Sequence, residues 1–452
     1  MQIIYPWKFI IIALVINTFF LYFCVNLLKS RRLCLEISPK REQQIDRKSI
    51  AILFLIIAIG FSLRIWKLGQ ENFETQELSY LFPSTKGLSL LFTTSPVNIK
   101  NVILHPANLL FFHAPLPSLL LYFLSFINKS VVTEEFLFRF PSVLFGVATI
   151  WIIFLLAREL FGKKTALLAS FLFALSPFHL YYSRSLEPYS ALCFFATVSY
   201  YLFVLIFFKN RHVLAPIYLI LLIFAYFYHY LSVLILGSHF LILLSCLLFR
   251  EWSKYKNYFF LLFPLVFFDG LEILCFFLLL LFFYKNKKKL FTPMEKNLLF
   301  YMALMSIFMY VAVLFFPFTA YSYYKGFPRV CETSSYVCFP FNFSNILKPV
   351  EFLNVIFGIF PNRLLETGLI IFTLVYFFIS LKRKEFYAFI ILLIGIVVPL
   401  FATLYGYLDF YVYAKGFYGG GYRWNILMLP FLYIIVSYGI NLIVPWKLFI
   451  KK

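Results

Sequence analysis

Acidic residues recur at three-residue spacing in one long polar loop, where a carboxylate could accept a proton or hold a cation. Glu71, Glu74 and Glu77 lie in the stretch Arg64–Pro117, which interrupts an otherwise mostly apolar sequence. A loop of this length without strong secondary structure of its own is usually functional or disordered. Aromatic residues along it argue against disorder. We therefore interpret the stretch as an active-site loop.

Three more polar groups stand between apolar runs and could contribute to the same site. Arg184 and Glu187 occur in the turn Ser183–Tyr189, His229 lies between two tyrosines, and Arg423 closes a late polar loop. Charges at membrane depth are costly and usually mark functional sites. A single loop charge is more often simply solvated, so only the recurrence of such groups at one face favours a shared site.

The elements that must position these residues are transmembrane helices. The 452-residue chain is 63% hydrophobic and only 13% charged, a balance that no soluble domain has. Apolar runs of about 20 residues recur from end to end, so we predict an all-α, polytopic membrane protein of about 11–13 transmembrane helices. The net charge of +21 does not indicate nucleic-acid binding, because the basic residues form short clusters between the apolar runs. That distribution is a topology signal.

The predicted topology alternates consistently with these basic clusters. The basic segment Lys29–Lys48 is expected to be cytoplasmic, which puts the acidic loop outside. Asn108–Ile127 is apolar but broken by Pro115 and Pro117, and it is expected to be a helix at or partly in the outer interface. Asn257–Tyr284 either spans twice with short arms or is re-entrant. The predicted spans are Trp7–Leu28, Ser49–Trp66, Phe138–Leu160, Thr165–Tyr182, Tyr189–Phe208, Val213–Tyr230, Leu231–Phe249, Leu298–Phe316, Thr367–Leu381, Phe386–Leu404 and Trp424–Val444.

Three motifs along the chain resemble one enzyme superfamily. RFPSVLFGV at Arg139–Val147, ARELFGKK at Ala157–Lys164 and ALSPFHLYYSR at Ala174–Arg184 are similar, in order and spacing, to the core of the GT-C glycosyltransferases. The closest branch is family 39, the protein mannosyltransferase and aminoarabinose transferase-like enzymes. The stretch around His113 resembles that family's H-P-P-L motif, and Arg423 resembles its carboxy-terminal motif. The resemblance is good over about residues 50–250.

The resemblance implies a GT-C-like organisation of the chain. Residues 1–48 would be an extra N-terminal transmembrane helix with a basic cytoplasmic loop. Residues 49–250 would form the catalytic transmembrane core with the outer loop 67–137, which bears interfacial helices. Residues 251–452 would be a variable transmembrane region with outer loops 317–363 and 405–422.

The resemblance also implies a reaction. A sugar would pass, with inversion, from a polyprenyl-phosphate donor in the membrane to a lipid, glycan or protein acceptor on the extracytoplasmic face, in a bacterial inner membrane. An acceptor hydroxyl needs a carboxylate to take its proton, and the phosphate leaving group needs a positioned arginine. The family's Asp–Glu pair is Gln76–Glu77 in this chain, and a neutral amide cannot accept the proton.

Roles follow for individual residues. Glu77 is the first candidate for the base and Glu74 the second. Arg184, Arg423 and Arg64 are expected at the donor phosphate, although Arg64 lies where a helix-end arginine commonly snorkels. The expected substrate-binding residues are His113, Glu187, Tyr189 and His229.

Several alternatives stay open. Cys331 and Cys338, in an outer loop, could form a disulfide in an oxidising compartment. Some relatives use a divalent metal, but no residues here have convincing ligand spacing, so no metal site is assigned. The departure at Gln76 favours a non-catalytic relative that binds a lipid-linked sugar or partners an active enzyme. A lipid-linked glycan carrier is the other alternative, although such a protein should show internal repeats, and none is found.

Overall fold

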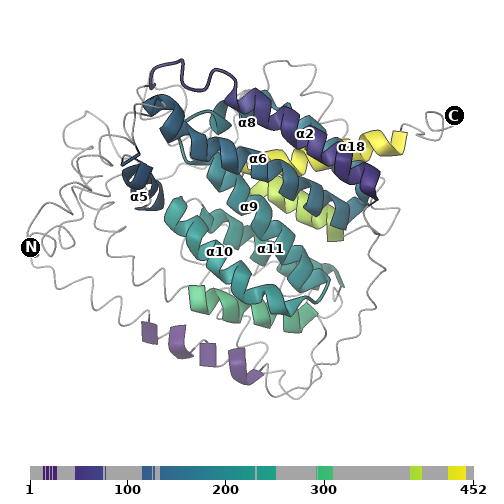
Figure 1. Cartoon of the computed structure of the whole chain (residues 1–452). Coiled ribbons are helices and arrows are strands. Elements are labelled where there is room, and N and C mark those ends of the chain that lie inside the picture. The colour runs from purple at the N-terminus through teal and green to yellow at the C-terminus, as the bar shows by residue number, and fades with distance from the viewer. Residues whose placement is uncertain are drawn as a thin grey trace, which may run out of the picture. The chain divides into compact units, whose positions relative to one another are not determined.

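In a computed structural model of the chain, the regular elements among the described residues are all helices (Figure 1). The described residues are 14–27 and 115–127 with short gaps, 46–74, 77, 133–229, 232–250, 292, 294–308, 387–399 and 426–443. They fall into two compact units. The first contains residues 1–41, 202–224 and 231–320, and the second contains residues 42–201, 225–230 and 321–452.

The second unit is built on a packed group of apolar helices. α2 (Arg47–Ile65) packs against α6 (Glu134–Phe161) and α7 (Lys163–Ala174), and α7 also packs against α18 (Leu429–Ile443). α6 begins at Thr133, whose hydroxyl accepts a hydrogen bond from the backbone N–H of Phe136. This contact satisfies one of the free N–H groups at the helix start.

Two special backbone positions turn the chain between these helices. α6 ends at Gly162, whose φ of 86° is in the region that favours glycine, and α7 begins at the next residue. α7 then bends by 63° into the short helix α8 (Pro177–Ser183). Ser176 caps α8 by accepting from the N–H of His179, and Pro177 occupies its first position, where a missing N–H costs nothing.

Several of the predicted membrane spans coincide with helices that the structure describes. Arg47–Ile65, Glu134–Phe161 and Tyr189–Phe208 are long and apolar enough to cross a membrane, and the bent α7–α8 pair makes a fourth. Shorter apolar helices overlap other predicted spans: α10 (Ala215–Tyr228), α11 (Val233–Arg250), Tyr387–Pro399 and α18. The chain is therefore an all-α integral membrane protein.

Two local predictions need correction. The predicted single span Thr165–Tyr182 is broken at Leu175 and Ser176, because Pro177 ends the hydrogen-bond ladder of α7. Pro115 and Pro117 do not break the predicted interfacial helix. They occupy the first turn of α5 (Pro115–Leu124), where proline is tolerated.

The first unit contains an irregular stretch of helix. α9 (Tyr189–Phe203) continues into the π-helical turn η2 (Val204–Phe208). The side-chain amide of Asn297 donates to the Phe207 carbonyl at 2.7 Å. Such turns leave backbone groups that need other partners. The hairpin Asn257–Tyr284 and the predicted span Thr367–Leu381 lie outside the described residues, and the division at residues 48 and 250 stays a prediction.

Candidate active site

A buried ion pair holds the first loop against α6. The Nε and one terminal nitrogen of Arg139 donate to the two carboxylate oxygens of Glu77, at 2.9 and 2.6 Å. Both residues are almost fully buried, with exposed fractions of 1% for Glu77 and 5% for Arg139. Two oxygens meeting two guanidinium nitrogens make a bidentate pair, which is the strongest geometry for such an interaction.

The same carboxylate ties two more segments together. The backbone N–H of Leu186, in the turn after α8, donates to one Glu77 oxygen at 2.8 Å, and the N–H of Glu74 donates to the other at 2.9 Å. Each oxygen therefore accepts two hydrogen bonds from the protein. A carboxylate offers about four acceptor positions in all. Glu77 has none left for an acceptor hydroxyl.

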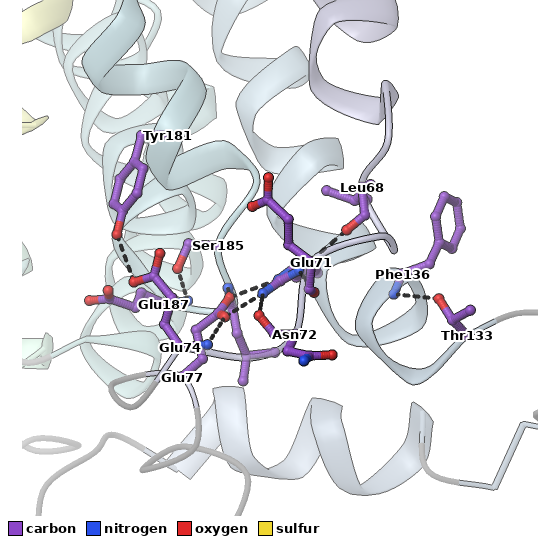
Figure 2. A network of polar contacts seen from close by, with 12 residues as sticks. Leu68, Glu71, Asn72, Glu74, Glu77, Thr133, Phe136, Tyr181, Ser185 and Glu187 are labelled. Atoms are coloured by element: carbon purple, nitrogen blue, oxygen red, sulfur yellow. Dashed lines mark hydrogen bonds and ion pairs between the residues drawn. The ribbon is translucent and has the colours of Figure 1, made fainter.

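Arg139 also orders the backbone of the loop. Its terminal nitrogens donate to the carbonyls of Leu68, Glu71 and Asn72 at 3.3, 2.8 and 3.0 Å. Figure 2 shows these three acceptor residues in the loop. The chain reaches this arrangement through Lys67, whose φ of 56° turns it sharply after α2. A positive φ is uncommon for a residue with a side chain and indicates that its surroundings impose it.

An apolar cluster supports the ion pair. Phe138 of α6, Leu121 of α5 and Leu186 of the turn are buried together, and Phe73 of the loop and Leu124 pack against them. The Phe73 ring also lies 5.2 Å from the Arg139 guanidinium carbon. The cluster keeps water from the pair, so its electrostatic attraction is weakened less by solvent.

The ionisation of Glu77 follows from this environment. Burial alone would raise the pKa of Glu77. The hydrogen bonds from Arg139 and from the N–H groups of Leu186 and Glu74 outweigh burial, so the pKa lies below the ordinary glutamate value. Glu77 is therefore a carboxylate at neutral pH, but a weak base.

Glu74 has the opposite character. Its side chain is exposed, and one oxygen accepts a hydrogen bond of 2.9 Å from the Tyr181 hydroxyl, as Figure 2 shows. Its backbone is held by Glu77, so the loop presents this carboxylate at a fixed place. A positioned carboxylate that keeps access to its surroundings fits a general base better than Glu77 does.

The turn after α8 brings the predicted phosphate and substrate residues next to the loop. Arg184 ends α8 and is half-buried, and no hydrogen bond joins its guanidinium to another described residue. Leu186 two positions later contacts Glu77. Glu187 is fully buried, and its backbone N–H donates to the Ser185 hydroxyl at 3.2 Å.

Aromatic side chains continue from this turn. The Tyr189 ring lies 5.4 Å from the His229 ring and 5.4 Å from the Tyr182 ring, and the Tyr182 ring lies 5.1 Å from that of Tyr181. The predicted substrate-binding residues Tyr189 and His229 are thus brought together, and the ring series leads to the hydroxyl that contacts Glu74.

Arg64 lies apart from these exposed groups. It is 0% exposed, and its guanidinium donates to the carbonyls of Gly60 and Ala174 and to Nδ1 of His179. In the described part of the chain, the fully buried Arg64 side chain has no exposed surface that a phosphate could contact. Its expected role at the phosphate stays a prediction that this geometry does not favour.

Several expected site residues lie outside the part of the chain that the structure describes. His113, Arg423 and Gln76 lie outside the described residues, as do Cys331 and Cys338. The described part of the chain contains no group of three or more His, Cys, Asp or Glu side chains arranged to hold a metal ion.

Sequence reasoning missed the roles of Arg139, Tyr181 and His179. All three occur in the motifs that carry the family resemblance, but no role was predicted for any of them. Arg139 could have been found from one signal, since a charged residue in the first turns of a long apolar helix needs a partner. Nothing in the spacing indicates that Tyr181 contacts Glu74.

Comparison with known proteins finds one matching family model. Residues 113–270 match the family model of dolichyl-phosphate-mannose-protein mannosyltransferase, a stretch that includes Arg139, Tyr181, Arg184 and His229. No curated protein matches the sequence. The match confirms the resemblance to the GT-C glycosyltransferases that the motifs predict.

Solved structures of an oligosaccharyltransferase from Archaeoglobus fulgidus are similar to this chain at low identity. The complex with zinc and sulfate is 15% identical over 85% of this chain and 48% of its own, with a TM-score of 0.44. The archaeal oligosaccharyltransferase AglB in complex with an inhibitory peptide and a dolichol-phosphate is 15% identical over 86% of this chain and 50% of its own, with a TM-score of 0.43. The chain spans about half the length of these structures.

Proposed function

We propose that this protein is a membrane glycosyltransferase that moves a sugar from a polyprenyl-phosphate donor to a lipid, glycan or protein acceptor. The single observation that carries the proposal is the exposed Glu74 carboxylate, held by Tyr181 one turn from Arg184. A proton acceptor and an unengaged cation are the two groups that this transfer needs. The family-model match over residues 113–270 supports the choice of reaction.

The reaction is a single displacement with inversion. The acceptor oxygen attacks the anomeric carbon while Glu74 takes the hydroxyl proton. The bond between that carbon and the phosphate oxygen breaks, and its electron pair leaves with the polyprenyl phosphate. Arg184, with Arg423 as a second candidate, offsets the charge on the leaving phosphate. Atoms and charge balance without a metal.

The donor class is inferred from two features. The matched family is described by a dolichyl-phosphate-linked sugar. An integral membrane protein also meets a lipid-borne donor within the plane of the membrane. The charge distribution of the sequence supports a site on the extracytoplasmic face. A bacterial inner membrane is the location that we propose.

The other residues serve the reacting groups. In the proposal, the Glu77–Arg139 pair fixes the loop so that Glu74 stands at the turn of Arg184. Tyr189 and His229 form an aromatic wall against which a sugar ring can pack. Glu187 and His113 stay candidate substrate residues.

The test uses purified full-length protein in proteoliposomes with synthetic short-chain polyprenyl-phosphate sugars that differ in the sugar. Release of polyprenyl phosphate is measured. Glu74→Gln should lower the rate about 100-fold or more, the range for loss of a general base. Glu71→Gln is the matched control, because that exposed side chain lies three residues away and only its backbone carbonyl is used. Equal activity of Glu74→Gln and the unaltered protein would refute the assignment.

A second candidate function is binding of a lipid-linked sugar without transfer. It is favoured by the full occupation of the Glu77 oxygens together with the neutral Gln76. Donor binding to the proteoliposomes without any release of polyprenyl phosphate, for every sugar and acceptor tried, would select this alternative.

A further inference from the structure

A fully buried arginine crosses from α2 to the bend between α7 and α8. One terminal nitrogen of Arg64 donates to the carbonyls of Gly60 and Ala174 at 2.8 and 3.1 Å, and the other lies 2.9 Å from Nδ1 of His179. Since a guanidinium only donates, Nδ1 must accept, and the proton of the neutral ring is on Nε2. None of the ion pairs between described residues includes Arg64. A buried charge kept without a counter-charge is costly, so a specific role is expected.

The partners of Arg64 lie on both sides of the 63° bend. Ala174 is the last residue of α7, and its usual helical partner would be the N–H of Phe178, beyond the bend. Arg64 supplies the missing donor to this carbonyl. His179 belongs to α8, so the same guanidinium holds the end of one helix and the body of the next.

The neighbouring helices leave space for this side chain. A Cβ built on Gly60 would lie 3.4 Å from a terminal nitrogen of Arg64, and a Cβ built on Gly146 of α6 would lie 3.1 Å from its Nε. The Gly146 Cβ would also clash with Ser183, the last residue of α8. The close approach of α2, α6 and α8 at this point therefore depends on glycine.

The bend determines where the site residues stand. α8 carries Tyr181, whose hydroxyl contacts Glu74, and it ends at Arg184. Two residues further, the N–H of Leu186 reaches Glu77. A change in the direction of α8 would move Arg184 and Tyr181 together, relative to the loop that carries Glu74.

We propose that Arg64 is a positioning residue for the transfer reaction: by joining the Ala174 carbonyl to His179, it fixes the α7–α8 bend and thereby aims the turn that carries Arg184 at Glu74. This role rests on the proposed function, and it replaces direct contact of Arg64 with the donor phosphate. A lysine keeps the charge but lacks the fork that spans two acceptors on different helices.

The test compares Arg64→Lys with the unaltered full-length protein in lipid nanodiscs, by amide hydrogen exchange and by the transfer assay. Exchange in residues 177–188 should rise about tenfold or more, while exchange within α6 stays unchanged. The rate constant for release of polyprenyl phosphate should fall about tenfold or more, while KM for the synthetic polyprenyl-phosphate sugar changes less than about twofold. His179→Ala removes one acceptor only and should give the same pattern, and the double variant should be no worse than the more impaired single variant.

Ser170→Ala is the matched control, because Ser170 is also fully buried and its hydroxyl donates to the Ile150 carbonyl at 3.2 Å, away from the bend. It should leave exchange in residues 177–188 and the rate within about twofold. The proposal is overturned if Arg64→Lys raises KM with unchanged exchange, or if exchange rises equally in all helices. If Arg64→Lys does not fold, His179→Ala decides by the same criteria. If the unaltered protein transfers no sugar, the proposed function fails, and the exchange measurement still decides whether Arg64 fixes the bend.

Discussion

The Glu77 carboxylate accepts all of its hydrogen bonds from groups of the protein itself. Its two oxygens accept from Arg139 and from the backbone N–H groups of Leu186 and Glu74. A group in this position stabilises the loop and the turn, whereas Glu74 keeps an exposed carboxylate with one tyrosine partner. Two glutamates three residues apart thus have different chemistry because only one of them is buried.

We predict that Glu77→Gln destabilises the fold more than it changes the chemistry. Breaking one partner of a buried pair leaves an uncompensated charge on Arg139, and the expected loss in the free energy of unfolding is about 3 kcal/mol. Thermal unfolding of the purified protein measures it. Glu74→Gln should unfold at the temperature of the unaltered protein, because its side chain is exposed. A Glu77→Gln variant of unaltered stability would contradict this assignment.

The same pair predicts an acid dependence of stability. Because the pKa of Glu77 is lowered in the folded protein, its contribution is complete above the unfolded glutamate pKa of about 4.3 and is lost as the pH falls through the lower folded value. The melting temperature of the unaltered protein should therefore fall between neutral pH and about pH 3 more steeply than that of Glu77→Gln. Parallel curves for the two proteins would show that Glu77 does not supply this dependence.

At the scale of elements, the loop is fixed where it leaves α2 and meets the start of α6. Lys67 turns the chain, and Gly69 then passes against Thr133 and Phe136. Thr133 caps α6, so the loop contacts the residue that begins the helix bearing Arg139. The loop and the first turn of α6 behave as one structural unit because this contact leaves no space between them.

We expect Gly69→Ala to disturb this unit. The added Cβ would clash with the Thr133 hydroxyl and lie 3.0 Å from the Phe136 Cβ, so the loop must move away from α6. The hydrogen bonds from Arg139 to the Leu68 and Glu71 carbonyls should weaken, with a loss of about 1–3 kcal/mol. Amide exchange in the loop and thermal unfolding measure the effect. Gly237→Ala is the control, since a Cβ there meets nothing within 4 Å.

At the scale of the whole molecule, the charges at the two ends of α2 predict its direction through the membrane. α2 has Arg47 and Lys48 at one end and the loop with Glu71 after the other. If the positive-inside rule holds for this helix, the basic end is cytoplasmic and the loop is outside.

We predict that Lys48→Cys and Glu71→Cys react in opposite compartments. Both side chains are exposed, and the two variants are made in a chain whose seven native cysteines are replaced by serine, because Cys331 and Cys338 are predicted in an outer loop and would react themselves. In intact bacterial cells a membrane-impermeant maleimide should label Glu71→Cys only, and disrupted cells should allow labelling of both. Labelling of Lys48→Cys alone in intact cells would reverse the orientation and remove the extracytoplasmic site.

Much of the architecture could be predicted from the sequence. The helices that the structure describes at Arg47–Ile65, Glu134–Phe161 and Tyr189–Phe208 correspond to predicted spans within a few residues. The break at Leu175 and Ser176 was not predicted, since the apolar run continues past Pro177 and only the backbone shows the bend. The polar, acidic character of the loop located it in the sequence, and the family resemblance ranked Glu77 before Glu74 as the base.

The sequence by itself determined that this is a helical membrane protein with polar groups gathered in a few loops, because apolar length and charge clusters act locally along the chain. Only the tertiary structure decided which of those groups pair. Glu77 lies 62 residues from Arg139, Glu74 lies 107 residues from Tyr181, and Arg64 lies 115 residues from His179. Contacts at such separations depend on how helices pack and bend, so the partner of a charge cannot be read from its neighbours in the chain.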